Sequence, residues 1–361
     1  MSKDYYSNYQ PKIDVKKRKK HSVYFHIFLF LATFLTTTIA GVQWAGHDFT
    51  HLENIAYGLT YGILMMLFFM SHEFGHYFAA RYHKVEATLP YFIPFPPAPG
   101  MIGLFGTFGA VIRTRSPIMS RKALFDIGVA GPIGGFIMSL IFLIYGLMTL
   151  PAIDFIYQIH PNYLVLYGGE IPVHGLFYGD TISYSILTNI FANPDGFLPP
   201  MNEIYHYPFL NVGWFGLFVT TLNMMPIGQL DGGHITYAMF GKKIQGIIAR
   251  IFWWLIMVMG GLGFLSIAHD FLSYEHVGTS YYFLKQIFFG PLDWIEINAP
   301  ILFDAWSGWL FWGIITKLFI KLDHPPVGDD ENLSQNRMLV GWLSIIILLL
   351  SFSYNGIYFV E

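Results

Sequence analysis

Residues 54–80 read NIAYGLTYGILMMLFFMSHEFGHYFAA, an apolar run that contains His72, Glu73 and His76. The run exceeds the roughly 20 residues that a helix needs to cross a bilayer, and ionisable side chains inside such a span are costly and usually functional. Histidines at positions i and i+4 share one helix face, so both imidazoles can bind one metal ion with the glutamate beside them. The stretch therefore predicts a metal site within a transmembrane helix. The alternative, two core histidines bonded to neighbouring helices, would leave their burial in hydrocarbon uncompensated.

The rest of the chain has the composition of a membrane protein. Of its 361 residues, 54% are hydrophobic and 12% are charged, against about 25% charged in soluble domains. A soluble globular protein is therefore excluded, and we expect an all-α polytopic membrane protein with about seven transmembrane helices. The apolar runs that predict these helices are 22–42, 54–80, 123–150, 209–224 continuing irregularly to about 240, 247–269, 300–320 and 339–359.

The distribution of Lys and Arg predicts the orientation. If the basic tail 1–21 is cytoplasmic, seven alternating spans place 19 of the 20 Lys and Arg residues on the cytoplasmic side, with Lys285 as the exception, as the positive-inside rule requires. We therefore expect one transmembrane domain over 22–359 with its core at 54–240. Residues 151–208 would then form an extracytoplasmic insertion, too short for a large domain and interpreted as a small cap.

Charge and cysteine content narrow the possible functions. The net charge of −3 gives no indication of a nucleic-acid-binding protein, which needs a basic surface to neutralise phosphates. The chain has no cysteine, so disulfides, thiolate metal sites and a cysteine nucleophile are excluded. Histidines and carboxylates remain as the available metal ligands.

A non-helical segment follows the span that carries the histidines. Prolines within 85–122 prevent a helix there, and the glycine-spaced run 100–114 favours extended strands. Lipid cannot satisfy the backbone groups of such a segment. We therefore expect a membrane-associated β-hairpin or re-entrant loop near 90–115, held against the protein at its cytoplasmic face. Its strand edge would either pair with an unwound substrate or merely cover the site.

Two histidines leave a catalytic zinc site one protein ligand short. The missing ligand must lie in the cytoplasmic half of the membrane, which excludes Asp270 and leaves Asp231 and Asp126. Asp231 is the better candidate because it lies in NMMPIGQLDGGH (223–234), where proline and glycines break the helix and permit close approach. Asp126 is interpreted as a helix-start or charge-paired residue. His234 is either a fourth ligand or a residue that lines the site or bonds a carbonyl.

These motifs together resemble the site-2 protease family of intramembrane zinc metalloproteases, in its branch without a PDZ domain, of the plastid and cyanobacterial type. The resemblance extends over about 65–240. It rests on HEFGH (72–76), PYFIPFP (90–96), IGLFGTFGAVIRTRSP (102–117), ALFDIGVAGPIGG (123–135) and NMMPIGQLDGG (223–233).

The resemblance implies one Zn²⁺ per chain with His72, His76 and Asp231 as ligands. It implies that Glu73 is the general base, and that Asn223 holds the substrate backbone or stabilises the oxyanion. Asn223 could instead make a hydrogen bond between helices. The glycines of 131–135 are interpreted as residues of close helix packing.

The function expected from these features is an intramembrane zinc metalloendopeptidase that cleaves a transmembrane helix of a partner protein, in regulated intramembrane proteolysis. Its partners would be that substrate and the lipid bilayer, with no nucleic acid. The alternative is a metal-binding membrane protein without proteolytic activity, either a pseudoprotease regulator or a transporter. A membrane-anchored metalloprotease with a cytoplasmic site is disfavoured because apolar residues surround the histidines. The sequence does not indicate the oligomeric state.

Overall fold

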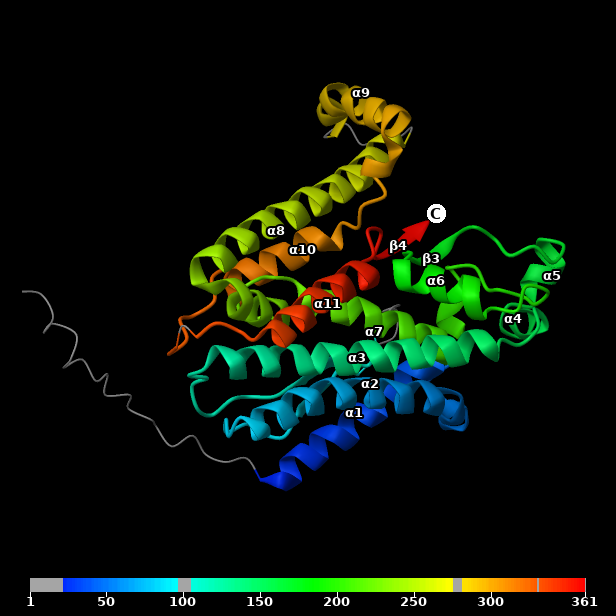
Figure 1. The fold of residues 1–361 in the computed structure, drawn as a ribbon. Coiled ribbons are helices and arrows are strands. Elements are labelled where there is room, and N and C mark those ends of the chain that lie inside the picture. Colours follow the sequence, from blue (N-terminus) through cyan, green and yellow to red (C-terminus); the bar gives the residue numbers. More distant parts are fainter. Residues whose placement is uncertain (1–21, 97–104, 275–280, 330, 361) are drawn as a thin grey trace, which may run out of the picture.

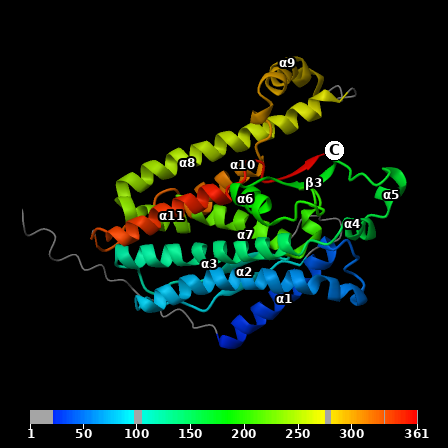
Figure 2. The ribbon, with the colours of Figure 1, turned by 45° about the vertical axis from the view of Figure 1, so that its right-hand side comes forward.

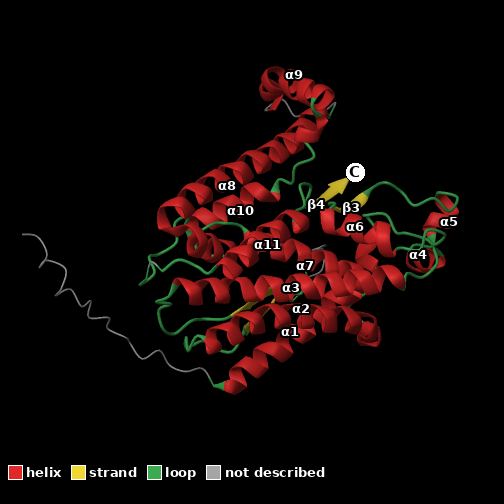
Figure 3. Cartoon of the chain, in the orientation of Figure 1, coloured by secondary structure: helices red, strands yellow, loops and turns green. Residues whose placement is uncertain are grey.

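The computed structural model describes residues 22–96, 105–274, 281–329 and 331–360. The predicted basic tail 1–21 and part of the glycine-spaced run, 100–104, lie outside the described residues. Within the described ranges the chain is mostly helical (Figure 3).

The long helices lie side by side in a layered bundle (Figures 1 and 2). Helix α9 (Tyr282–Asn298) projects from the end of the bundle beyond α8. The bundle consists of α1 (Val23–Trp44), α2 (Ile55–Tyr82), α3 (Arg121–Met148), α7 (Pro208–Met224), α8 (Asp231–Ser273), α10 (Gly308–Ile315) and α11 (Gln335–Ser351).

Four helices of the described chain are long and apolar enough to cross a membrane. They are Val23–Trp44, Leu52–Tyr82, Arg121–Met148 and Asp231–Ser273. Helices occupy the other predicted spans, but they are shorter: α7 and α11 have 17 residues each, and α10 continues into a single π-turn (Thr316–Ile320). The predicted helical membrane architecture is therefore supported, while the count of seven spans stays a prediction.

The predicted helix break before Asp231 is present. Helix α7 ends at Met224, residues 225–230 are non-helical, and α8 begins at Asp231. A second interruption follows within α8, where Gly241 has φ 78° and ψ 173°. This backbone conformation is open to glycine and strongly disfavoured for other residues. The irregular fourth span therefore consists of α7, the break and a first helical segment of α8 that ends near Gly241.

Glycines allow the first three helices to pack closely. A Cβ atom at Gly58 of α2 would lie 1.9 Å from the carbonyl oxygen of Thr38 in α1, and one at Gly75 would lie 2.5 Å from that of Ala130 in α3. On α3, a Cβ at Gly134 would lie 2.7 Å from the carbonyl oxygen of Ser71. The backbones thus touch at these positions, as small residues permit between membrane helices.

The predicted hairpin forms beside α1 and α2. Strand β1 (Tyr91–Pro94) pairs with β2 (Thr107–Val111) in antiparallel register, with Tyr91 opposite Val111. A register irregularity lies between Phe92 and Pro94. The strands therefore agree with the expected hairpin near 90–115, while its re-entry into the membrane stays a prediction.

The insertion 151–208 folds against one end of the bundle and against the C-terminal strand. Its strand β3 pairs in antiparallel register with β4 (Ile357–Val360), so the fold contains a second two-stranded sheet that the sequence did not predict. The elements of the insertion are α4 (Asp154–Ile159), α5 (Asn162–Leu166), β3 (Gly175–Tyr178), α6 (Ile182–Phe191) and the 3₁₀ turn η2 (Ile204–His206).

Replacing Gly58 by alanine is expected to destabilise the protein by about 1–3 kcal/mol, the usual cost of overpacking, because α1 and α2 must separate. Thermal unfolding in detergent measures the effect. Gly261→Ala is the matched control, since a Cβ there meets no atom within 4 Å and alanine favours helix by about 1 kcal/mol. Equal melting temperatures for the two variants would contradict this account of the α1–α2 contact.

Candidate metal centre

Helices α2 and α8 bring three of the predicted site residues together. His72 and His76 lie one turn apart on α2, with their Nε2 atoms 3.1 Å apart. Asp231 lies at the first position of α8, and its Oδ2 is 3.4 Å from Nε2 of His72 and 3.3 Å from Nε2 of His76. The same three residues form a group whose ligand atoms could hold one metal ion.

The spacing of these atoms fits a zinc ion. Zinc bonds to histidine nitrogen and carboxylate oxygen are about 2.0–2.2 Å long, so ligand atoms at the corners of a tetrahedral site lie about 3.3–3.5 Å apart. The three observed separations, 3.1–3.4 Å, are close to this edge length. Three protein ligands leave a fourth position for water or substrate, as in catalytic zinc sites.

The surroundings of His76 orient its ring for this role. Its Nδ1 lies 2.7 Å from the carbonyl oxygen of Ile127 in α3, both groups being buried. A carbonyl oxygen only accepts hydrogen bonds, so Nδ1 carries the proton and Nε2 offers its lone pair. Nδ1 of His72 is buried and has no hydrogen-bond partner among the described residues.

Two glycines of α3 make room for the imidazoles. A Cβ atom at Gly131 would lie 2.1 Å from Nε2 of His76, and one at Gly135 would lie 3.2 Å from Nδ1 of His72. The predicted packing role of these glycines is therefore correct but incomplete, because Gly131 faces a candidate ligand atom itself.

The break between α7 and α8 positions Asp231. Gly228 has φ +51°, and its N–H donates a hydrogen bond to the carbonyl oxygen of Leu322. A Cβ at Gly232 would lie 1.9 Å from the carbonyl oxygen of Met224. Only glycine permits this approach, so the end of α7 folds back onto the start of α8 and the carboxylate reaches α2.

The other candidates from the sequence lie outside the ligand group. Asp126 accepts hydrogen bonds from both Nε and an Nη of Arg337 at 2.9 and 2.7 Å and contacts His83 at 2.7 Å, which agrees with its interpretation as a charge-paired residue. Nδ1 of His234 lies 2.7 Å from Nε2 of His324. His234 therefore lines the site and joins a histidine pair.

A cavity of about 520 Å³ opens over the centre. Glu73 and Asn223 line it, as do residues 110–112 at the end of β2. Other residues of the lining were not expected from the sequence, among them Gln229, His324 and the segment 325–327. The local sequence signal for this loop is a histidine followed by two prolines, at 324–326.

The hydrogen bonds of His324 fix the protonation of the histidine pair. Its Nδ1 lies 2.6 Å from the carbonyl oxygen of Pro325 and must donate to it. Burial lowers the pKa of His324, so its ring is neutral and its Nε2 accepts from Nδ1 of His234. The pair thus connects α8 to the loop on the far side of the cavity.

We expect His72→Ala, His76→Ala and Asp231→Ala each to lose the zinc held at this centre, because two remaining ligands do not form a stable site. Gly131→Ala should weaken zinc binding by roughly 10–100-fold, the usual effect of disturbing a ligand's support. Competition with a chromophoric chelator measures both effects. Asp126→Asn is the control and should bind zinc normally. Loss of zinc in this variant, with retention in Asp231→Ala, would show that the carboxylate ligand is Asp126 and not Asp231.

Comparison with known proteins places this geometry in a family. The model of Peptidase family M50 matches residues 60–265. "Probable zinc metalloprotease EGY2, chloroplastic" of Oryza sativa subsp. indica is 28% identical over 263 residues, which cover 70% of this chain and 40% of that protein. "Probable zinc metalloprotease EGY1, chloroplastic" of Arabidopsis thaliana is 33% identical over 190 residues, which cover 53% of this chain and 31% of that protein.

The chain thus spans well under half the length of these curated relatives. No solved structure matches. The family match covers more than half of the chain, includes all three residues of the metal centre and confirms the resemblance found in the sequence. The chain therefore belongs to peptidase family M50, the site-2 protease family, and is similar to relatives named as chloroplastic zinc metalloproteases.

Proposed function

We propose that the protein is a zinc metalloendopeptidase that cleaves a transmembrane helix of a partner membrane protein. The observation that carries the proposal is the convergence of His72, His76 and Asp231 next to Glu73 in a cavity between apolar helices. The family and its relatives named zinc metalloproteases support the same chemistry.

The side chains of the site have separate roles in the proposed peptide hydrolysis. His72, His76 and Asp231 would hold a zinc ion, which would supply Lewis acidity to polarise the scissile carbonyl and to make water more acidic. Glu73 takes the proton of the attacking water and returns it to the leaving amine. Asn223, which also lines the cavity, donates its amide N–H to the substrate backbone or to the developing oxyanion.

A substrate must be extended before it is cut, because a helix hides its carbonyls in hydrogen bonds. The cavity is lined by residues 110–112 of β2 and its extension. The carbonyl oxygen of Arg113 accepts a hydrogen bond from Thr88 on the β1 side, and backbone groups alternate along a strand. Ala110 and Ile112 therefore direct their backbone groups away from β1, toward the cavity, where an unwound substrate strand can pair with them.

The proposal includes a location. The four long apolar helices and the family indicate a multi-pass membrane protein. The charge distribution of the sequence favours a cytoplasmic N-terminus, with the metal centre in the cytoplasmic half of the bilayer. Cleavage there would release a fragment of the substrate to the cytoplasm.

The alternative functions lack a specific supporting observation. A pseudoprotease regulator has no need of a base, yet Glu73 lines the cavity beside both histidines. A transporter is expected to show paired broken helices in two related halves, and the sequence contains no such repeat.

Glu73→Gln tests the chemistry separately from binding. Glutamine keeps the shape of the side chain but cannot accept a proton, so we expect unchanged zinc content and a loss of at least about 100-fold in cleavage of a model transmembrane substrate. Single-turnover cleavage in proteoliposomes provides the rate, with Glu53→Gln, in the turn before α2, as the control. Undiminished cleavage by Glu73→Gln would require a different base.

Ala110→Pro tests strand pairing, because proline removes one backbone donor from the cavity-facing edge. Loss of one hydrogen bond of about 0.5–1.5 kcal/mol should lower kcat/KM roughly 2- to 12-fold, with zinc content and melting temperature unchanged. Ala110→Ser, which keeps the N–H, is the matched control. Wild-type cleavage by the proline variant would show that β2 only covers the site.

A further inference from the structure

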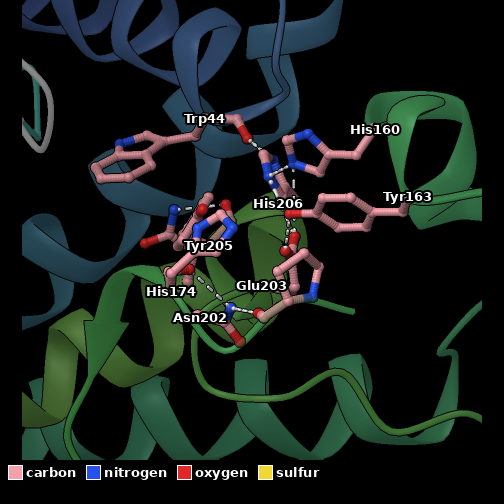
Figure 4. A network of polar contacts seen from close by, with 10 residues as sticks. Trp44, His160, Tyr163, His174, Asn202, Glu203, Tyr205 and His206 are labelled. Carbon is pink, nitrogen blue, oxygen red and sulfur yellow. Dashed lines mark hydrogen bonds and ion pairs between the residues drawn. The ribbon is translucent and has the colours of Figure 1, made fainter. Parts of the chain in front are cut away.

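We propose that the insertion holds a second zinc ion, bound by His160, Glu203 and His206. Figure 4 shows the three side chains directed toward one another at the end of the bundle where α1 terminates. They form a separate group whose ligand atoms could hold a metal ion. His160 follows α4, Glu203 immediately precedes η2, and His206 is the last residue of η2.

The distances between the three ligand atoms are similar to those of the first centre. The Nε2 atoms of His160 and His206 lie 2.9 Å apart. Oε2 of Glu203 is 3.6 Å from the first of these nitrogens and 3.5 Å from the second. These separations of 2.9, 3.6 and 3.5 Å lie around the value of about 3.3–3.5 Å expected between nitrogen and oxygen ligands of a tetrahedral zinc ion.

Hydrogen bonding alone leaves this cluster unsatisfied. Nδ1 of His206 faces the carbonyl oxygen of Trp44 and therefore carries the proton, so Nε2 of its neutral ring has only a lone pair to offer. A proton on Nε2 of His160 would satisfy the contact between the two rings. That proton would not satisfy Oε2 of Glu203, which is buried and has no hydrogen-bond partner in the described chain.

A cation satisfies all three ligand atoms at once. The side chain of Glu203 is only 1% exposed, and that of His206 is 4% exposed. Water is therefore largely excluded from both groups and cannot supply the hydrogen bond that Oε2 of Glu203 lacks. A divalent cation compensates the carboxylate and uses the lone pairs of both imidazoles.

The outer contacts already orient the ligands as they do in zinc sites. Tyr163 donates a hydrogen bond of 2.8 Å to the other carboxylate oxygen of Glu203, and its ring stacks on that of His160. The carbonyl of Trp44 orients His206. Such partners fix the ring orientation and protonation of metal-binding residues. The side chain of His160 is 32% exposed, which leaves an open side for entry of the ion and for a water ligand.

The bound ion would connect parts of the chain that are distant in sequence. His160 and His206 are 46 residues apart, and His206 is bonded to the last residue of α1 and lies just before α7. The site would therefore fasten the insertion to the ends of two bundle helices.

A third histidine and carboxylate cluster is less suitable. His269 contacts Glu296 through Nδ1 at 3.1 Å and Asp293 through Nε2 at 3.7 Å. The two carboxylates face opposite nitrogens of one ring, and both are about half exposed. The closest contacts of this cluster thus use both nitrogens of one ring, and its carboxylates can be solvated by water, so it gives a weaker argument for a bound ion.

Zinc analysis of purified full-length variants, equilibrated with zinc and then freed of excess ion, tests the proposal. We expect about two zinc ions in the wild type, one in His160→Ala, one in Asp231→Ala and none in the double variant. His160 is the residue to change because its partial exposure makes the substitution tolerable for folding. His160→Ala should retain cleavage of the model substrate, since the first centre is intact.

Two control variants test whether the loss of zinc is specific to the proposed ligands. His174→Ala, in the same insertion, and His269→Ala should each keep both zinc ions. Cobalt titration of the Asp231→Ala variant gives a second readout, with visible absorption that disappears when His160 is also replaced. The proposal is overturned if Asp231→Ala binds no metal, or if His160→Ala leaves the zinc content unchanged. These outcomes do not depend on protease activity.

Discussion

The approach of one carboxylate to two imidazoles is the constraint on which the rest of the structure depends. Oδ2 of Asp231 lies within 3.4 Å of both histidine nitrogens on α2, although the residues are far apart in sequence. A short break in the chain and the glycines at 228 and 232 permit this contact. Gly131 of α3 permits it from the other side, because any side chain there would occupy the space of His76.

This constraint explains how ionisable side chains can be buried in an apolar helix bundle. Ionisable groups in hydrocarbon require partners, and the three ligand candidates, Asp126 and His234 each have one. The ligands face each other, Asp126 is paired with Arg337, and His234 is bonded to His324. Glu73 lines the cavity, and in the proposed function the edge of β2 that faces away from β1 would supply backbone partners for an extended substrate. The proposed binding, unwinding and hydrolysis of a substrate would thus require only elements that lie around one pocket.

The sequence predicted features that depend on local patterns. Helical periodicity placed His72 and His76 on one face, and proline and glycine located the break before Asp231. Contacts between distant segments left no such pattern. The pairing of β3 with β4, the entry of His324 into the cavity wall, and the meeting of His160 with His206 depend on how the chain folds back. The spacing of Glu203 and His206, three residues apart, was a local signal that was overlooked.

The central claim is that one metal ion is bound by His72, His76 and Asp231. An experimental structure of the zinc-loaded protein, with anomalous differences recorded on both sides of the zinc absorption edge, tests it most directly. The account predicts an anomalous peak about 2.0–2.2 Å from Nε2 of both histidines and from a carboxylate oxygen of Asp231. A peak bound by other residues, or none at this position in zinc-loaded protein, would contradict it.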